Sequence, residues 1–141
     1  MKPTLKPQLL ATGLGLAFVG VATAAAQAAT PATPPSITVF DQKVQANTLS
    51  VDYAYLPADG YIVIYGADKD GNPIKEPLGH AELKAGDHRG VKIEFKSAPK
   101  TGTTLWASLY SDKDGKPGFD RSGDAPFWND ALPMQNRFVI R

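Results

Sequence analysis

Apolar and polar residues alternate over several short stretches of this chain, and no other feature restricts its fold as much. Leu49, Val51, Tyr53 and Tyr55 are each separated by one polar or small residue. Successive side chains of a β-strand point to opposite faces, so this period of two predicts strands with one buried face. No window of eleven residues shows the spacing of an amphipathic helix. The sequence therefore predicts an all-β fold.

Other segments predict the remaining strands of such a fold. Tyr61–Tyr65 is apolar on both faces and lies between two glycines, as expected of a central strand. The predicted strands are 37–44, 49–55, 61–65, a short proline-interrupted edge at 74–83, a half-exposed edge at 91–95, 105–109 and 136–141. We expect an antiparallel, immunoglobulin-like β-sandwich of about six to eight strands, with a small Greek-key barrel as the alternative.

The first 28 residues have the order of a secretory signal peptide. A basic start, Met1–Lys6, precedes an apolar run, Leu9–Val21, and the alanine-rich end contains the A-x-A pattern Ala26–Ala28. An uncleaved membrane anchor is the weaker alternative. We expect cleavage after Ala28 and export to the periplasm or the cell exterior, with no membrane span in the remainder. A proline-rich leader, 29–36, then precedes the domain at 37–141.

Composition and charge argue against several functions. Residues 1–28 contain two lysines and no acid, so fifteen basic against fourteen acidic residues become thirteen against fourteen after cleavage. That balance argues against a nucleic-acid binder, which needs a clustered basic face. The absence of cysteine excludes disulfides and thiolate sites. We expect a single monomeric domain that requires no cofactor, and no enzyme, because no serine lies in a Gly-x-Ser-x-Gly motif and no acid–base set stands out.

Four carboxylates, Asp112, Asp114, Asp120 and Asp124, crowd one segment near the C-terminal end. The segment begins like a calcium loop, with Asp-x-Asp-Gly at 112–115. Its twelfth position, however, is Gly123, where such a loop has a bidentate glutamate. The favoured interpretation is a structural turn in which aspartates cap backbone N–H groups and glycines supply positive φ. Weak Ca²⁺ binding by these four residues is the metal-site hypothesis.

The tetrapeptide Asp-Lys-Asp-Gly occurs a second time, at Asp68–Gly71, where it follows a strand and predicts a hairpin turn. His80 and His88 are the only histidines and flank a turn. Together they would offer a Zn²⁺ or Cu²⁺ pair, so a small periplasmic metal-handling protein is the alternative function. Two ligands are too few for a site, and hydrogen bonds to the backbone are the favoured role of both rings.

Aromatic residues gather in and after the acidic segment, among them Phe119, Phe127 and Trp128. They predict either a surface for a sugar or peptide ligand or, as the favoured interpretation, a cover that pins a long connection to the sandwich. Exposure of Trp128 would favour the ligand surface.

The mature part also resembles a family of uncharacterised domains from secreted and surface proteins of bacteria and haloarchaea. The resemblance rests on Asp41-Gln42, the Leu-Pro-x-x-Gly-Tyr-Ile-Val run of 56–63, the Leu78–His80 and Gly86–His88 segments, and the stretch ending in Asp124–Phe127. It implies an exported β-sandwich and brings no established activity. We therefore expect an exported accessory binding or structural module, with an unidentified protein or carbohydrate as its ligand.

Overall fold

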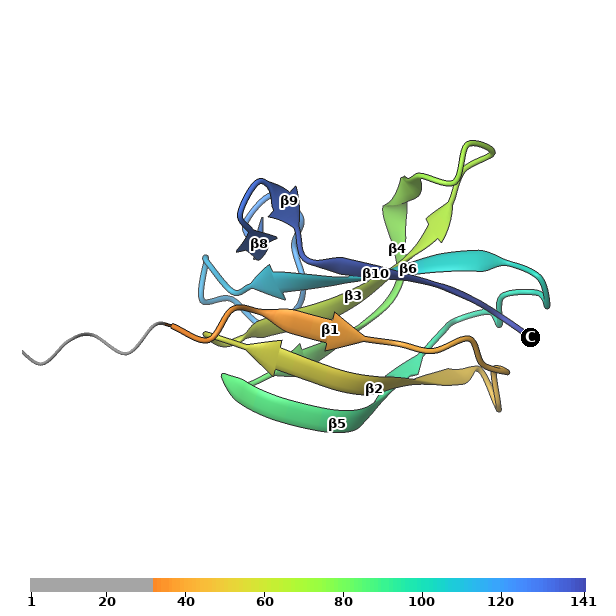
Figure 1. Cartoon of the computed structure of the whole chain (residues 1–141), viewed down its shortest axis with the longest axis horizontal. Coiled ribbons are helices and arrows are strands. Elements are labelled where there is room, and N and C mark those ends of the chain that lie inside the picture. Colours follow the sequence, from red (N-terminus) through yellow and green to blue (C-terminus); the bar gives the residue numbers. More distant parts are fainter. Residues whose placement is uncertain (1–31) are drawn as a thin grey trace, which may run out of the picture. The chain divides into compact units, whose positions relative to one another are not determined.

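Two antiparallel sheets pack face to face in the computed structural model, which describes residues 32–141 (Figure 1). One sheet has the order β1-β2-β5 and the other the order β10-β6-β3-β4, with β7 added beside β6. The bounds are β1 Ser36–Thr38, β2 Thr48–Leu56, β3 Gly60–Ala67, β4 Pro73–Leu83, β5 Gly86–Glu94, β6 Thr104–Ser111, β7 Ala125–Pro126, β8 Trp128–Asn129, β9 Leu132–Pro133 and β10 Gln135–Val139. The predicted signal peptide and residues 29–31 of the predicted leader lie outside the described residues.

The strand order is that of an immunoglobulin-like sandwich. If β1 to β6 and β10 are named A, B, C, C′, E, F and G, the two sheets read A-B-E and G-F-C-C′. Every pairing between these strands is antiparallel. The sheets do not close into a ring. The predicted sandwich is therefore confirmed, and the alternative barrel is not formed.

The hydrophobic core fills the space between the sheets and uses the alternating faces that the sequence shows. Side chains at most 1% exposed come from both sheets, and they include Leu49, Val51, Ile93, Ile62, Ile64, Leu105 and Leu109. Each such side chain stabilises the fold by about 1.5–3 kcal/mol relative to an exposed one. The core is thus large enough to hold a domain without cysteines.

Three strands differ from their predicted bounds: β1 ends at Thr38 although 37–44 was expected, β5 already begins at Gly86 although 91–95 was expected, and β4 differs most. The edge expected to be short is β4, the longest strand among the described residues, with eleven residues. It is an edge strand, since it pairs only with β3. The pairing shifts register where Pro77 lies opposite Tyr65 and Pro73 opposite Ala67. Prolines are tolerated at such irregular positions of an edge strand, so they did not shorten it.

Two glycines, one at the start of β3 and one inside β4, allow backbones to approach closely. A Cβ atom on Gly60 would lie 2.0 Å from the carbonyl oxygen of Tyr110, and one on Gly79 would lie 2.7 Å from that of Glu94. Only a residue without a side chain fits at either place.

Within residues 32–141, no helix is long and apolar enough to cross a membrane.

Candidate functional site

The segment between β6 and β7 brings three of the four predicted calcium ligands together. One carboxylate oxygen from each of Asp112, Asp114 and Asp124 lies within 4.8 Å of the other two. Asp124 is buried at 6% exposure, whereas Asp112 and Asp114 are half-buried. Calcium takes six to eight oxygen ligands, so these carboxylates would supply only part of its shell.

Backbone N–H groups hold these carboxylates in place. The two oxygens of Asp124 accept the N–H of Lys113 at 3.2 Å and of Asp120 at 2.8 Å. Asp112 accepts the N–H of Gly115 and Asp114 accepts the N–H of Lys116, each at 2.9 Å. The aspartates therefore shape the loop, as the structural interpretation predicted. Calcium binding by the cluster stays a prediction.

Asp120 does not join the cluster. Its carboxylate accepts the backbone N–H of Ser122 at 2.9 Å and the Ser122 hydroxyl at 2.8 Å. These bonds, the backbone one first, lower the pKa of Asp120 below its usual value. This side chain closes its own turn.

Gly123 fixes where Asp114 lies. A Cβ atom on Gly123 would be 2.2 Å from Oδ2 of Asp114, which is far inside van der Waals contact. The absence of a side chain at Gly123 therefore lets the carboxylate of Asp114 reach the cluster.

Aromatic side chains cover the outer face of the five-stranded sheet and pin the acidic segment to it. Phe119 packs edge-on against Tyr110 and Tyr61, with ring centroids 4.8 and 5.8 Å apart. Such pairs stabilise by about 0.5–1.5 kcal/mol beyond the area they bury. Burial, and then the nearby acidic side chains, Asp112 first, raise the pKa of Tyr61 to about 12. The predicted cover is confirmed for Phe119.

Trp128 lies elsewhere, on a small flap. After Phe127 the chain leaves the sheet, forms the β8–β9 hairpin and returns at Met134, whose N–H bonds to the carbonyl of Phe127 at 2.7 Å. In Figure 1 this flap and the β3–β4 turn project from the same side of the sandwich. Trp128 is 55% exposed and Leu132 is 71% exposed. For Trp128, exposure favours the ligand surface over the cover.

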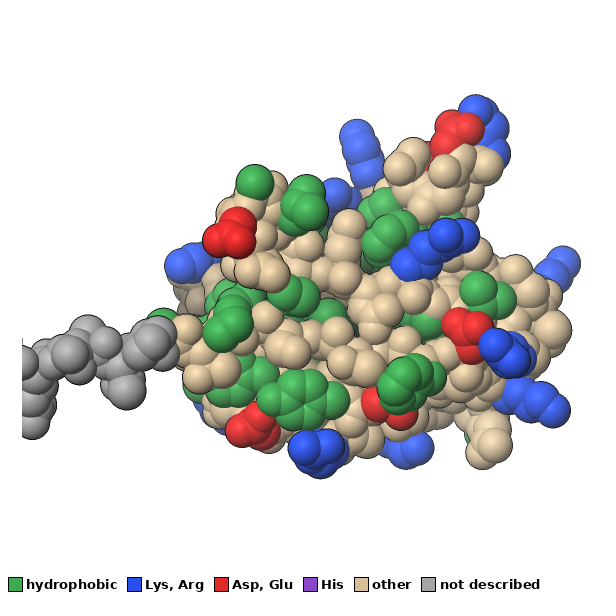
Figure 2. Space-filling model, in the orientation of Figure 1, with side chains coloured by type: hydrophobic (Ala, Val, Ile, Leu, Met, Phe, Trp, Pro, Cys, Tyr) green, Lys and Arg blue, Asp and Glu red, His purple; other side chains and the backbone are tan. Residues whose placement is uncertain are grey.

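A cleft of about 300 Å³ lies between these two projections. Its lining comes from β3, β4, β6, β7, β10, the acidic segment and the flap: Tyr65, Pro73, Ile74, Ser108, Tyr110, Arg121, Pro126, Trp128, Pro133 and Gln135. Figure 2 shows the surface hollowed there, with hydrophobic side chains on both projections. The volume is at the lower end of the range for small-molecule sites. A larger hollow of about 770 Å³, beside Lys43, Lys92 and Glu94, has no aromatic side chain in its lining.

Arg121 places one positive charge in the cleft. Its Nη1 donates to the carbonyl oxygen of Lys75 at 2.8 Å, and its guanidinium lies over the ring of Tyr65, 5.6 Å from the centroid. Arg121 is thus turned toward β3 and β4, and the cleft is built partly by the acidic segment itself.

The profile of a family described as "Domain of unknown function (DUF7282)" matches residues 35–140. The chain belongs to this family. A search of curated proteins finds no match.

In this DUF7282 domain, the early Asp41-Gln42 pair is structural. The Gln42 amide donates to the carbonyl of Ser50 at 2.7 Å and accepts the Ser50 N–H at 2.9 Å. Asp41 accepts the N–H of Val139 and a bond from Arg141, each at 2.9 Å. The pair ties the chain after β1 to β2 and to the C-terminal end of the domain.

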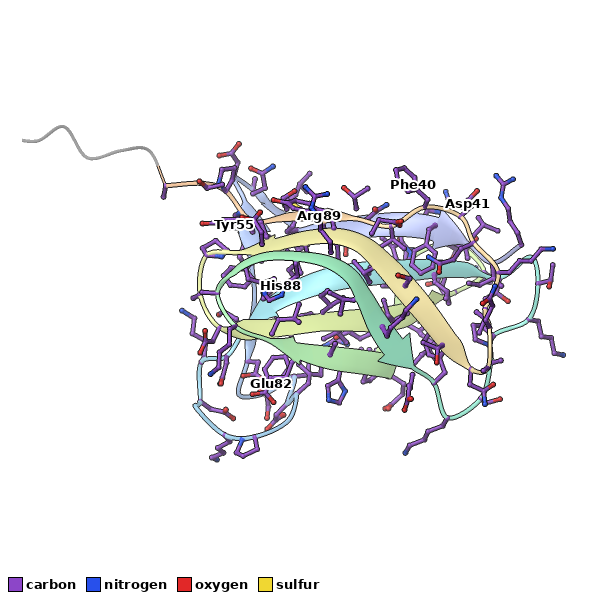
Figure 3. The ribbon with its side chains drawn as sticks, turned by 90° about the horizontal axis from the view of Figure 1, so that it is seen from below. Phe40, Asp41, Tyr55, Glu82, His88 and Arg89 are labelled. Atoms are coloured by element: carbon purple, nitrogen blue, oxygen red, sulfur yellow. The ribbon has the colours of Figure 1, made fainter. Side chains whose placement is uncertain are left out.

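His80 and His88 have separate surroundings in the DUF7282 domain. His80 lies on β4, where its ring packs near Tyr61 and Phe119, with centroids 6.2 and 6.3 Å away. His88 lies on β5, in the other sheet, and its Nε2 donates to the carbonyl of Lys84 at 2.6 Å (Figure 3). Among residues 32–141, no group of three or more ligating side chains includes either histidine.

The first Asp-Lys-Asp-Gly copy forms the predicted hairpin turn between β3 and β4. Asp68 accepts the N–H groups of Asp70 and Asn72, each at 2.9 Å, and Gly71 has φ of 84°. Because β3 and β6 are antiparallel, this turn and the acidic segment follow opposite ends of that pair. The two copies do not share ligands.

Sequence reasoning missed the flap and the place of Arg121. No periodicity marks the two-residue strands β8 and β9. The only signal is the dense run of proline, aromatic and turn residues from Ala125 to Met134.

Proposed function

We propose that this protein is an exported accessory module that binds a ligand in the cleft between the β8–β9 flap and the β3–β4 turn. The observation that carries the proposal is the exposed indole of Trp128 on the wall of that cleft. Large aromatic side chains bury much apolar area at little cost in conformational entropy, so a half-exposed tryptophan beside a concave surface suits recognition.

Export is the second part of the proposal. The basic start, the apolar run and the A-x-A pattern before residue 29 support it. A chain without cysteine that folds on a large core also suits a compartment in which thiols would be oxidised. The resemblance to domains of bacterial and haloarchaeal secreted and surface proteins agrees with export. We expect a monomer that does not bind nucleic acid.

Binding suits the cleft better than catalysis. Its lining contains no carboxylate and no histidine, and Arg121 is its one charged side chain. Arginine stays protonated at all ordinary pH values and does not serve as a general base. Burial, and then the bond to Tyr110, raise the pKa of Tyr65, so its phenol stays protonated at neutral pH and does not serve as a base. The groups of the lining therefore suit orienting a ligand better than accepting its proton.

Tryptophan fluorescence tests ligand binding directly. The chain has two tryptophans, and the indole of Trp106 already donates to the carbonyl of Gly71 at 2.9 Å. We expect at least one of a panel of neutral oligosaccharides, acidic oligosaccharides and short peptides to shift the emission of Trp128. The substitution Trp128→Ala removes the reporter, so its binding is measured by calorimetry and should be abolished. Phe40→Ala should preserve binding, since Phe40 is 65% exposed and outside the cleft lining. Binding that survives Trp128→Ala would contradict the proposed site.

Calcium binding by the acidic cluster is tested by thermal unfolding. With a dissociation constant on the order of 10⁻⁴ to 10⁻³ M, 10 mM Ca²⁺ would stabilise the domain by about 1.4–2.7 kcal/mol. Asp114→Asn should remove the effect. Asp70→Asn is the matched control because it alters the same position of the other Asp-Lys-Asp-Gly copy. The same melting temperature in Ca²⁺ and in chelator would rule the site out.

A further inference from the structure

We propose that the ligand of the cleft is an acidic polysaccharide, bound through a pyranose ring that carries a carboxylate. This inference rests on the proposed function and adds the chemical class of the ligand. Three properties of the cleft lead to it: the shape of its walls, the polarity of its floor and the sign of its charge.

The walls of the cleft are apolar, and one of them carries the flat indole of Trp128. On the flap side they consist of the Trp128 indole and the rings of Pro126 and Pro133, and on the other side of Pro73 and Ile74. Trp128 and Ile74 are exposed, so their surfaces face solvent until a ligand covers them. The flat face of the indole matches the C–H face of a sugar ring, and burying the apolar walls against such a ring is favourable.

The floor of the cleft carries hydrogen-bonding groups. Ser108 and Gln135 lie opposite each other on β6 and β10, and both line the cleft. Beside them, the hydroxyl of Tyr65 donates to the hydroxyl of Tyr110 at 3.1 Å. Ser108 and the two tyrosines are buried, whereas Gln135 is half-buried. A wholly apolar ligand, such as an aliphatic side chain, would separate the Gln135 amide from water without replacing its hydrogen bonds, which costs free energy. The hydroxyl edge of a sugar ring replaces them.

The charge of the cleft selects an anion. Arg121 is the only charged residue of the lining, and its fixed contacts with the Lys75 carbonyl and the Tyr65 ring hold the guanidinium in position. Only one of its five N–H groups is used by the Lys75 carbonyl, so others remain for a carboxylate. Arginine binds carboxylates through paired N–H groups, and such bonds are about twice as strong as neutral ones.

The cleft is also open to the surface, between two projections that do not meet above it (Figure 2). A polymer can therefore pass through while one ring occupies the hollow. A polysaccharide fits this shape better than a free monosaccharide, which an enclosed pocket would hold.

The experiment compares trigalacturonic acid with its methyl ester, which keeps the rings and removes the charge. Binding to the purified protein is followed by calorimetry and by Trp128 fluorescence. We expect the acid to bind, the ester to bind at least roughly tenfold more weakly, and added salt to weaken binding of the acid. Oligomers of alginate and of glucuronate extend the comparison to other uronic acids.

Three variants locate the contacts, and two others serve as controls. Trp128→Ala and Arg121→Gln should each weaken binding of the acid roughly tenfold or more, and Arg121→Lys should fall between, since it keeps the charge and loses the planar fork. We expect Phe40→Ala to bind the acid as tightly as the unsubstituted protein does. Arg89→Gln is the matched control for Arg121, because Arg89 lies over the ring of Tyr53 at 5.2 Å, on the other sheet (Figure 3). Thermal unfolding confirms that each variant is folded.

The results separate this inference from the proposed function. Equal binding of acid and ester, or no effect of Arg121→Gln, would overturn the acidic ligand while a Trp128-dependent site remains. If an acidic proline-rich peptide binds more tightly than any uronate, the polysaccharide inference is overturned and the ligand is a peptide. If no uronate binds at millimolar concentration, the inference fails, and the proposed function fails as well only when the neutral sugars and peptides also show no binding.

Discussion

Phe119 should determine how firmly the acidic segment is held, and Phe119→Ala tests this. The ring is half-buried on the outer face of the five-stranded sheet, against Tyr61, Tyr110 and His80. The segment that carries it also supplies Arg121 to the cleft. Loss of this ring should therefore loosen one side of the proposed binding site as well as the loop.

The cost of Phe119→Ala follows from these contacts. A fully buried phenylalanine contributes about 1.5–3 kcal/mol through area, so a half-buried one contributes about 1–1.5 kcal/mol. Two edge-to-face pairs, with Tyr61 and Tyr110, add about 0.5–1.5 kcal/mol each. The sum is about 2–4.5 kcal/mol, a large part of a typical domain stability of about 5–15 kcal/mol. The melting temperature should fall by about 10 °C or more.

Urea unfolding followed by circular dichroism measures the global loss, and hydrogen exchange locates it. Relative to the unsubstituted protein, hydrogen exchange should accelerate more for the amides of 112–124 than for those of β3 and β6. The reason is that the segment loses its largest contact with the sheet. The control is Phe40→Ala, which removes an equal side chain that is 65% exposed and should change stability by less than about 0.5 kcal/mol. If the two variants are equally stable, the aromatic contacts do not hold the segment, and the hydrogen bonds of Asp124 are sufficient.

Three further outcomes are expected. Asp124→Asn should lower the free energy of unfolding in urea by about 1–3 kcal/mol, because the single oxygen of a buried amide cannot accept both backbone N–H groups that the carboxylate accepts. An unchanged urea midpoint would refute this. Gly60→Ala should lower the melting temperature far more than Gly118→Ala, because it places a Cβ atom 2.0 Å from the Tyr110 carbonyl oxygen. The Cβ atom of Gly118→Ala meets open space, so that variant costs only about 1–2 kcal/mol for an alanine in the left-handed conformation. Similar melting temperatures of the two variants would show that β3 can move. Tyr61 has a pKa of about 12 in the folded state and 10.0 ordinarily, so the stability it contributes is complete below pH 10 and is lost as the pH rises toward 12. Phenolate absorbance should show that Tyr61 ionises above pH 10. Ionisation at the ordinary pKa would contradict its burial.

Most of the sandwich could be predicted from local patterns. The alternation at 49–55 gives β2 with its buried face, and the doubly apolar run at 61–65 is β3, which lies between β4 and β6. The length of β4 could not be predicted, because prolines normally interrupt a strand and only the register shifts opposite β3 accommodate them.

The candidate site was only partly predictable. Asp112, Asp114 and Asp124 converge, whereas Asp120 bonds to Ser122. Sequence spacing alone cannot distinguish these roles, since they depend on the path of the loop.

The sequence by itself determined the composition of the two faces of each strand, because side chains alternate along an extended backbone whatever the rest of the chain does. It also determined that aspartates and glycines would build the turns. Only the tertiary structure decided that Phe119 covers the sheet while Trp128 remains exposed. The reason is that both positions depend on contacts distant in sequence, such as that of Arg121 with Lys75 and those of Phe119 with Tyr61. Local patterns do not encode such contacts. The one between Arg121 and Lys75 holds a residue of the cleft lining, and those of Phe119 hold the segment that carries Arg121.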